Sequence, residues 1–151
     1  APVVFNGRLY AIDTSGTVHA YDAASGAPVW SVTIEPDNGG SASVFGGGVS
    51  VDANRVYATN GVGEVAALNP SDGSQIWRVK PAGPLRGAPT LAFGSVYVMT
   101  QDNQLIALNQ TDGTTTWSQS GSLGQAGVFG AALKAESAGA PVSPCGTPAS
   151  V

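Results

Sequence analysis

The stretch ALNPSDGSQIW, residues 67–77, decides the fold, because two related stretches repeat it in one register. They are AYDAASGAPVW at residues 20–30 and ALNQTDGTTTW at residues 107–117, which gives periods of 47 and 40 residues. A unit repeated at such a period buries its faces by stacking on its neighbours. The structural residues of the repeat are small or aromatic: Ala20, Ala67 and Ala107, Gly26, Gly73 and Gly113, and Trp30, Trp77 and Trp117.

Each unit is predicted to be a β-meander, since apolar and polar residues alternate in short runs between polar or glycine-rich turns. Four strands at this period are typical of a propeller blade. We therefore expect an all-β fold: a partial β-propeller with three four-stranded antiparallel blades, at about residues 2–34, 47–80 and 88–119. Propellers close with about four to eight blades. These three are accordingly expected to form an open arc of a longer propeller of seven or eight blades.

The repeated tryptophan is expected to be the wedge between blades, because it is large, apolar and carries one N–H that needs a partner. Trp30 and Trp77 should pack at blade interfaces, whereas Trp117 should be more exposed because no regular blade follows it. Two blade faces stay open in such an arc. We expect the isolated chain to associate through them at high concentration.

The repeat fades after Trp117, and the blades are assigned to one domain over residues 1–125. Residues 126–151 are expected to hold the degenerate start of a fourth blade and a disordered tail. From residue 133 onward the chain consists largely of Ala, Gly, Pro and Ser. Such a segment buries too little apolar surface to offset its ordering entropy.

The composition argues against several kinds of partner and chemistry. Charged residues make up 11% of the chain, less than half of the usual value of about 25%, and the net charge is −4 with six basic residues. These basic residues are scattered, and a nucleic-acid surface needs clustered Lys and Arg, so no nucleic-acid partner is expected. A single Cys excludes an intrachain disulfide, and a single His argues against a metal centre. No apolar run approaches the roughly 18 residues of a membrane span.

No catalytic residue is predicted. The aspartates lie in turns that repeat from blade to blade, and Asn replaces Asp22 at the equivalent positions, which a general base would not tolerate. The stretch GVGEVA, residues 61–66, matches a loose dinucleotide pattern, yet an alternating strand follows it where that pattern needs a helix. His19 is interpreted as a surface or edge histidine. We expect no catalytic site, no cofactor and no metal.

Leu85 and Arg86 are the candidate partner-binding residues. They lie in PAGPLRG, residues 81–87, the short connection between the second and third blades. Arginine offers a planar fork of five donors and leucine an apolar anchor, and the rigid blades on both sides would hold them in place. The alternative is an ordinary exposed loop residue beside a partly buried leucine.

The repeated units resemble the tryptophan-docking motif of quinoprotein-like propeller repeats over about residues 2–119. Several families share that motif: quinone-dependent alcohol and glucose dehydrogenases, propeller extensions of bacterial kinases, and BamB, the propeller lipoprotein of the outer-membrane β-barrel assembly machinery. Two stretches resemble BamB in its alphaproteobacterial forms. They are VFGGGVSVDANRVYATNGVGEVAALNPSDGSQIWRVK, residues 44–80, and PLRGAPTLAFGSVYVMTQDNQLIALN, residues 84–109.

The resemblance to BamB implies a non-catalytic scaffold at the periplasmic face of the outer membrane. In the family, a Leu-Arg pair in this inter-blade loop contacts the BamA subunit, and here that pair is Leu85 and Arg86. A further apolar position of the family is Gly83 in this chain. The resemblance also implies unfolded outer-membrane proteins as clients. It implies membrane attachment only through a lipid-bearing cysteine, which would precede Ala1 and is not present in this chain.

A fragment of a quinone-dependent dehydrogenase is the alternative, and a sensor or adaptor propeller is a third. Resemblance to the dehydrogenases would imply adjacent cysteines in a vicinal disulfide, with acidic and Asn ligands to calcium. The chain has one cysteine, Cys145. This alternative therefore requires the catalytic residues to lie outside the chain.

Overall fold

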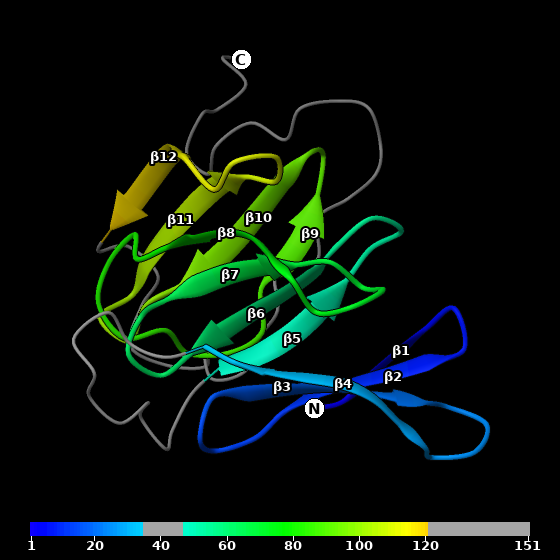
Figure 1. The fold of residues 1–151 in the computed structure, drawn as a ribbon. Helices are drawn as coiled ribbons and strands as arrows, with labels where there is room; N and C mark the ends of the chain where they lie inside the picture. Colours follow the sequence, from blue (N-terminus) through cyan, green and yellow to red (C-terminus); the bar gives the residue numbers. More distant parts are fainter. Residues whose placement is uncertain (35–46, 121–151) are drawn as a thin grey trace, which may run out of the picture.

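The computed structural model describes residues 1–34 and 47–120, where the chain forms twelve β-strands in three four-stranded sheets (Figure 1). Each sheet is an antiparallel meander in which strands that follow one another in the chain are paired, and the described ranges contain no helix. The prediction of an all-β fold with three four-stranded blades is confirmed. The expected fourth-blade start and tail, residues 126–151, lie outside the described residues.

The three sheets are called blades 1, 2 and 3. Blade 1 consists of β1 (Val3–Phe5), β2 (Arg8–Ile12), β3 (Thr17–Asp22) and β4 (Pro28–Thr33). Blade 2 consists of β5 (Gly47–Val51), β6 (Val56–Asn60), β7 (Val65–Leu68) and β8 (Gln75–Val79). Blade 3 consists of β9 (Thr90–Ala92), β10 (Ser95–Met99), β11 (Gln104–Asn109) and β12 (Thr115–Ser120).

One cross-strand row of residues recurs in every blade. In blade 1, Tyr10 on β2 pairs with Ala20 on β3, which pairs with Trp30 on β4. The small alanine between the two aromatic residues lets their rings approach, with centroids 6.0 Å apart and an interplanar angle of 47°. Blades 2 and 3 repeat the row with centroid distances of 6.1 and 5.9 Å, through Tyr57, Ala67 and Trp77 and through Tyr97, Ala107 and Trp117.

The turn between the third and fourth strands has one geometry in all three blades. Its last residue, Gly26, Gly73 or Gly113, has φ of 75, 77 or 78°, and its N–H donates over 2.8 Å to the carbonyl of Asp22, Asn69 or Asn109. That Asp or Asn also accepts, through its side chain, the N–H two residues further on. Asp and Asn exchange freely because both supply this acceptor.

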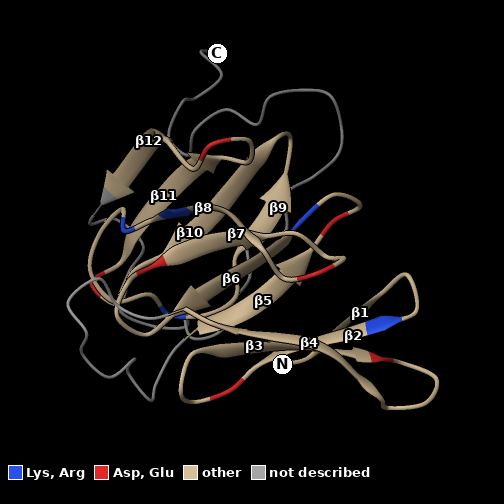
Figure 2. Ribbon diagram, viewed as in Figure 1, with Lys and Arg blue, Asp and Glu red and all other residues tan. Residues whose placement is uncertain are grey.

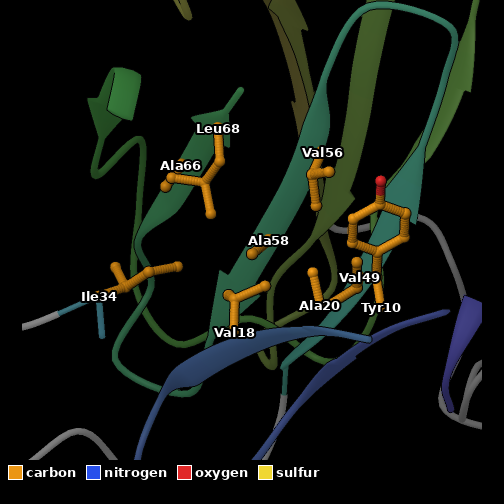
Figure 3. Packing of buried hydrophobic residues seen from close by; sticks show 9 residues of the cluster. All are labelled: Tyr10, Val18, Ala20, Ile34, Val49, Val56, Ala58, Ala66 and Leu68. Carbon is orange, nitrogen blue, oxygen red and sulfur yellow. The ribbon is translucent and has the colours of Figure 1, made fainter. Parts of the chain in front are cut away.

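Two apolar cores lie between the blades, one at each contact. The first joins Tyr10, Val18, Ala20 and Ile34 of blade 1 to the facing aliphatic side chains of blade 2, as Figure 3 shows. The second joins blade 2 to blade 3 through nine buried residues: Tyr57, Val65, Ala67, Trp77, Leu85, Val96, Val98, Ile106 and Leu108. Stacking of neighbouring blades thus buries the apolar side chains that a single four-stranded sheet would leave exposed to water.

Each tryptophan docks on the blade that follows it. Trp30 donates its Nε1–H to the Pro70 carbonyl over 3.0 Å, and a Cβ added to Gly73 would lie 2.6 Å from the indole. Trp77 likewise donates its Nε1–H to the Gln110 carbonyl over 2.8 Å, and a Cβ added to Gly113 would lie 2.6 Å from its indole. The prediction that Trp30 and Trp77 pack at blade interfaces is confirmed.

Trp117 is 43% exposed, against 8% for Trp77, and blade 3 is the last blade that the structure describes. The small residues against the ring divide into two kinds: the alanine comes from the same blade, and the glycine comes from the next one. Trp117 has the alanine of its own blade, Ala107, beside it, and no glycine in the described residues lies against its ring.

Candidate interaction segment between blades 2 and 3

Residues 81–87 cross from β8 to β9 between two hairpin turns. On the blade 2 side, the carbonyls of Ala82 and Gly83 lie so close to Gly63 that a Cβ there would be 2.7 and 2.6 Å from them. Gly63 therefore has to be glycine, both for this approach and for its φ of 103°. The β6–β7 turn and the segment are in direct contact.

On the blade 3 side, the segment pairs with the β10–β11 turn as a short extra strand. Leu85 and Thr100 form an antiparallel bridge. The Arg86 N–H donates to the Met99 carbonyl over 2.9 Å, and the Gln101 N–H donates to the Pro84 carbonyl over 2.8 Å. The backbone of the segment is thereby fixed against blade 3.

The side chain of Leu85 is completely buried, at 0% exposure, and belongs to the core between blades 2 and 3. The expectation that Leu85 offers a partner an apolar anchor does not hold in this arrangement, because no part of its side chain is exposed. The bridge to Thr100 directs the side chain inward, and removing it from that core would forfeit its apolar burial. Leu85 instead anchors the segment from within.

Arg86 remains at the surface, half-buried, with its guanidinium across the β10–β11 turn. Its Nε–H donates to the Thr100 carbonyl over 3.3 Å, and its Nη2–H donates to the Gln101 carbonyl over 2.7 Å in an exposed position. The planar group is thus held in a defined direction by two carbonyls and by the buried neighbour that precedes it.

Two buried polar residues lie in the β6–β7 turn beside the segment, and the sequence analysis did not single them out. Asn60 and Glu64 are each 2% exposed. Asn60 Nδ2 donates to Glu64 Oε2 over 2.8 Å, and Asn60 Oδ1 accepts the Glu64 N–H over 2.9 Å. The available signal was their register: Asn60 occupies the place of Asp13 in blade 1 and Thr100 in blade 3, and all three close the same type of turn.

The chain's single histidine lies on β3 beside the corresponding turn of blade 1. His19 is half-buried, its Nε2 lies 2.9 Å from Asp13 Oδ2, and its ring stacks on Tyr21 at 6.0 Å. The hydrogen bond from His19, followed by that from Ser15, lowers the pKa of Asp13 well below its usual range. His19 is partly exposed on β3, an inner strand of blade 1, and has one acidic neighbour there. Residues 1–34 and 47–120 contain no cluster of three His, Cys, Asp or Glu residues suited to a metal ion.

Charged residues are few and dispersed over the blades (Figure 2). The acidic residues gather in turns, where Asp22, Asp72 and Asp112 accept neighbouring backbone and hydroxyl donors, which lowers the pKa of each. No helix in the described part of the chain is long and apolar enough to cross a membrane.

The three stacked meanders, each docked on the next by a tryptophan, define the chain as an arc of propeller blades. Two solved structures share this arrangement at a TM-score of 0.67 and match 80% of the chain. They are BamB from Moraxella catarrhalis, at 20% identity over 35% of its chain, and the quinohemoprotein alcohol dehydrogenase from Comamonas testosteroni, at 24% identity over 20% of its chain. At these identities the likeness is one of fold.

Sequence comparison distinguishes BamB from the quinone-dependent dehydrogenases, which the shared fold does not. A family model described as outer membrane protein assembly factor BamB matches residues 14–142. The chain belongs to the BamB family. Among similar proteins are those named outer membrane protein assembly factor BamB from Moranella endobia and from Salmonella typhimurium. The Moranella protein is 31% identical over 120 residues, which cover 77% of this chain and 31% of that protein. The Salmonella protein is 36% identical over 96 residues, which cover 62% of this chain and 24% of that protein.

The chain spans about a third or less of the length of these curated relatives. They are named as assembly factors and not as enzymes, which agrees with the expectation of a non-enzymatic protein. The match also confirms the resemblance found in the sequence to BamB and to quinoprotein-like repeats.

Proposed function

We propose that this chain is part of a non-catalytic scaffold of the outer-membrane protein assembly machinery, binding a BamA-like subunit through residues 81–87. Membership of the BamB family supports the machinery. The observation that carries the proposed surface is the pairing of a buried Leu85 with a surface Arg86 in one rigid segment.

The contact side chain in this proposal is Arg86, and Leu85 positions it. A guanidinium already held across two carbonyls loses little rotamer freedom on binding, which reduces the entropy cost of association. Its partner would be a carboxylate or a group of carbonyls, because these match a planar fork of donors. The apolar family position that is Gly83 here adds no side chain, so we assign the recognition to Arg86 and the exposed backbone around it.

The same proposal places the protein at the periplasmic face of the outer membrane, attached through a lipid anchor outside this chain. Unfolded outer-membrane proteins are the proposed clients, along exposed strand edges. The alternative, a fragment of a quinone-dependent dehydrogenase, is supported by a shared fold at 24% identity, whereas the two sequence relatives described above are both named BamB.

A pull-down with the BamA-like subunit of the same organism tests the proposal. The chain with Arg86→Glu should lose the subunit, because the substitution removes the fork and adds repulsion toward an acidic partner. Arg55→Glu is the matched control, since Arg55 is also half-buried but lies at the far end of β6 from the segment. Circular dichroism would establish that both variants fold. Equal retention of the subunit by both would refute this surface.

A further inference from the structure

Buried polar side chains gather around residues 81–87. Within residues 1–34 and 47–120, four polar or charged residues are buried, and all of them lie at or next to the β6–β7 and β10–β11 turns that contact this segment: Thr59, Asn60, Glu64 and Thr100. Burying a polar group costs free energy unless it is hydrogen-bonded. Their concentration at one place therefore indicates a local requirement for polar contacts.

Thr59 holds a position of the repeat that is apolar in the other two blades. It comes two residues after the tyrosine of the cross-strand row, where blades 1 and 3 carry Ile12 and Met99. The strand itself therefore does not require a hydroxyl at this place. Thr59 is also 0% exposed, so contact with water does not account for the hydroxyl either.

The Thr59 hydroxyl joins the segment to blade 2. It donates to the Gly87 carbonyl over 2.7 Å and accepts the N–H of Gly48, on β5, over 3.0 Å. Gly48 in turn lies so close to Ala88 that a Cβ added to the glycine would be 2.6 Å from that side chain. The hydroxyl thus connects two strands of blade 2 to the residue that directly follows Arg86.

Gly87 brings no side chain that could hold the backbone after Arg86. Nothing lies within 4 Å of the place where its Cβ would be, so packing at this residue does not fix the chain. On the other side of Arg86, the bridge between Leu85 and Thr100 holds the backbone against blade 3. The hydrogen bond from Thr59 supplies the corresponding restraint against blade 2.

Thr100 stabilises the blade 3 side of the segment. It is 0% exposed, its Oγ1 accepts the Gln104 N–H over 2.9 Å, and its hydroxyl donates to the Asp102 carboxylate. These bonds close the β10–β11 turn, whose carbonyls at Thr100 and Gln101 accept the Arg86 guanidinium. Arg86 therefore lies between two buried threonines, one from each blade.

We propose that Thr59 is a positioning residue for partner binding: its hydroxyl fixes residues 86 and 87 to blade 2, so that Arg86 meets the partner in one orientation. This inference rests on the proposed function of residues 81–87 and names a residue on which that function depends. A group that is held in place before binding loses less conformational entropy in the complex. Removing the hydroxyl should therefore weaken binding, although Thr59 is buried and does not touch the partner.

Two substitutions separate the hydroxyl of Thr59 from the shape of its side chain. Thr59→Val keeps the shape and removes both hydrogen bonds, whereas Thr59→Ser keeps the hydroxyl and removes a methyl group. Val56→Ala is the matched control, because Val56 is buried on the same strand but belongs to the core between blades 1 and 2. It should lower the stability of the chain and leave the segment in place.

Amide hydrogen exchange of the complete chain, without a partner, tests the restraint itself. The Arg86 N–H donates to Met99 and the Gln101 N–H donates to Pro84, so both amides report local opening of the segment. Thr59→Val should speed the exchange of both about tenfold, as expected for the loss of one hydrogen bond. Thr59→Ser and Val56→Ala should leave it unchanged. Wild-type exchange in Thr59→Val would overturn the inference.

Calorimetric titration of the folded variants with the BamA-like subunit tests the consequence for binding. Thr59→Val should raise the dissociation constant about tenfold, and Thr59→Ser and Val56→Ala should bind as the wild type does. In an Arg86→Ala chain, Thr59→Val should have no further effect, because a positioning residue acts through the group that it positions. Equal losses in both backgrounds, or no loss where Arg86→Ala weakens binding, would overturn the inference. If Arg86→Ala itself left binding unchanged, the proposed surface would fail, and the exchange rates alone would decide whether Thr59 fixes the segment.

Discussion

Trp77 of blade 2 lies against Gly113 of blade 3 so closely that a Cβ on the glycine would be 2.6 Å from the indole Cε3. The same relationship joins Trp30 to Gly73. A tryptophan on one blade thereby dictates a glycine on the next, 36 residues later for Trp77 and 43 residues later for Trp30. The spacing differs because the connections between blades differ in length, while the contact stays the same.

Gly113→Ala should lower the free energy of unfolding by about 2 kcal/mol or more, because it adds a clash with Trp77 to the strain of a positive φ. Gly94→Ala is the control: its φ is 74°, and a Cβ there meets nothing within 4 Å. It should cost only the backbone strain, about 1 kcal/mol. Urea unfolding of both variants measures the difference, and equal losses would contradict the docking geometry.

Truncating the buried and the exposed tryptophan should have unequal effects on stability. Trp77→Ala is expected to cost about 3–5 kcal/mol, as for other buried aromatic residues. Trp117→Ala should cost clearly less when measured at a concentration where the chain is monomeric, because 43% of that side chain is exposed. Thermal or urea unfolding at low protein concentration distinguishes them. Similar losses would mean that Trp117 is covered by part of its own chain.

Leu85→Ala should destabilise the fold rather than affect only binding. The side chain is fully buried between blades 2 and 3, so its removal leaves a cavity that costs about 2–5 kcal/mol. Arg86→Ala removes a surface group and should cost about 1 kcal/mol at most. Urea titrations of both variants test the division of roles. A Leu85→Ala chain as stable as the wild type would restore Leu85 as a surface contact.

Acidification should weaken the contribution of Asp13. Its pKa in the folded chain is lowered, chiefly by His19 and Ser15, so the stabilisation is fully present above the unfolded-state pKa, about 3.9. It is lost as the pH falls below that value. Asp13→Asn should therefore reduce stability by under about 1 kcal/mol at pH near 5, since the pair is exposed. The two chains should converge at lower pH, and a difference that widens on acidification would contradict this sign.

The sequence predicted the parts of the fold that depend on local spacing. The four-stranded meander of each blade and its glycine-rich turns follow from strand alternation and turn chemistry, and both were found. Which glycine faces which tryptophan did not follow, because that contact crosses between blades.

The candidate segment was located correctly between blades, but the direction of Leu85 was not. Its inward direction is set by the bridge to Thr100, 15 residues further along the chain, and no local pattern encodes that pairing. The buried pair Asn60 and Glu64 was missed for a related reason. A glutamate in a glycine-rich turn is typical of the surface, and no local pattern indicates that this one is only 2% exposed.

Calorimetric titration of the chain with the BamA-like subunit tests the proposed function most directly. We expect equal dissociation constants for the wild type and Arg55→Glu, a dissociation constant about thirtyfold higher or more for Arg86→Ala, and a still higher one for Arg86→Glu. The salt dependence should also be smaller for Arg86→Ala, since it lacks the charged contact. Identical binding by all four folded chains would contradict the assignment of residues 81–87 as the partner surface.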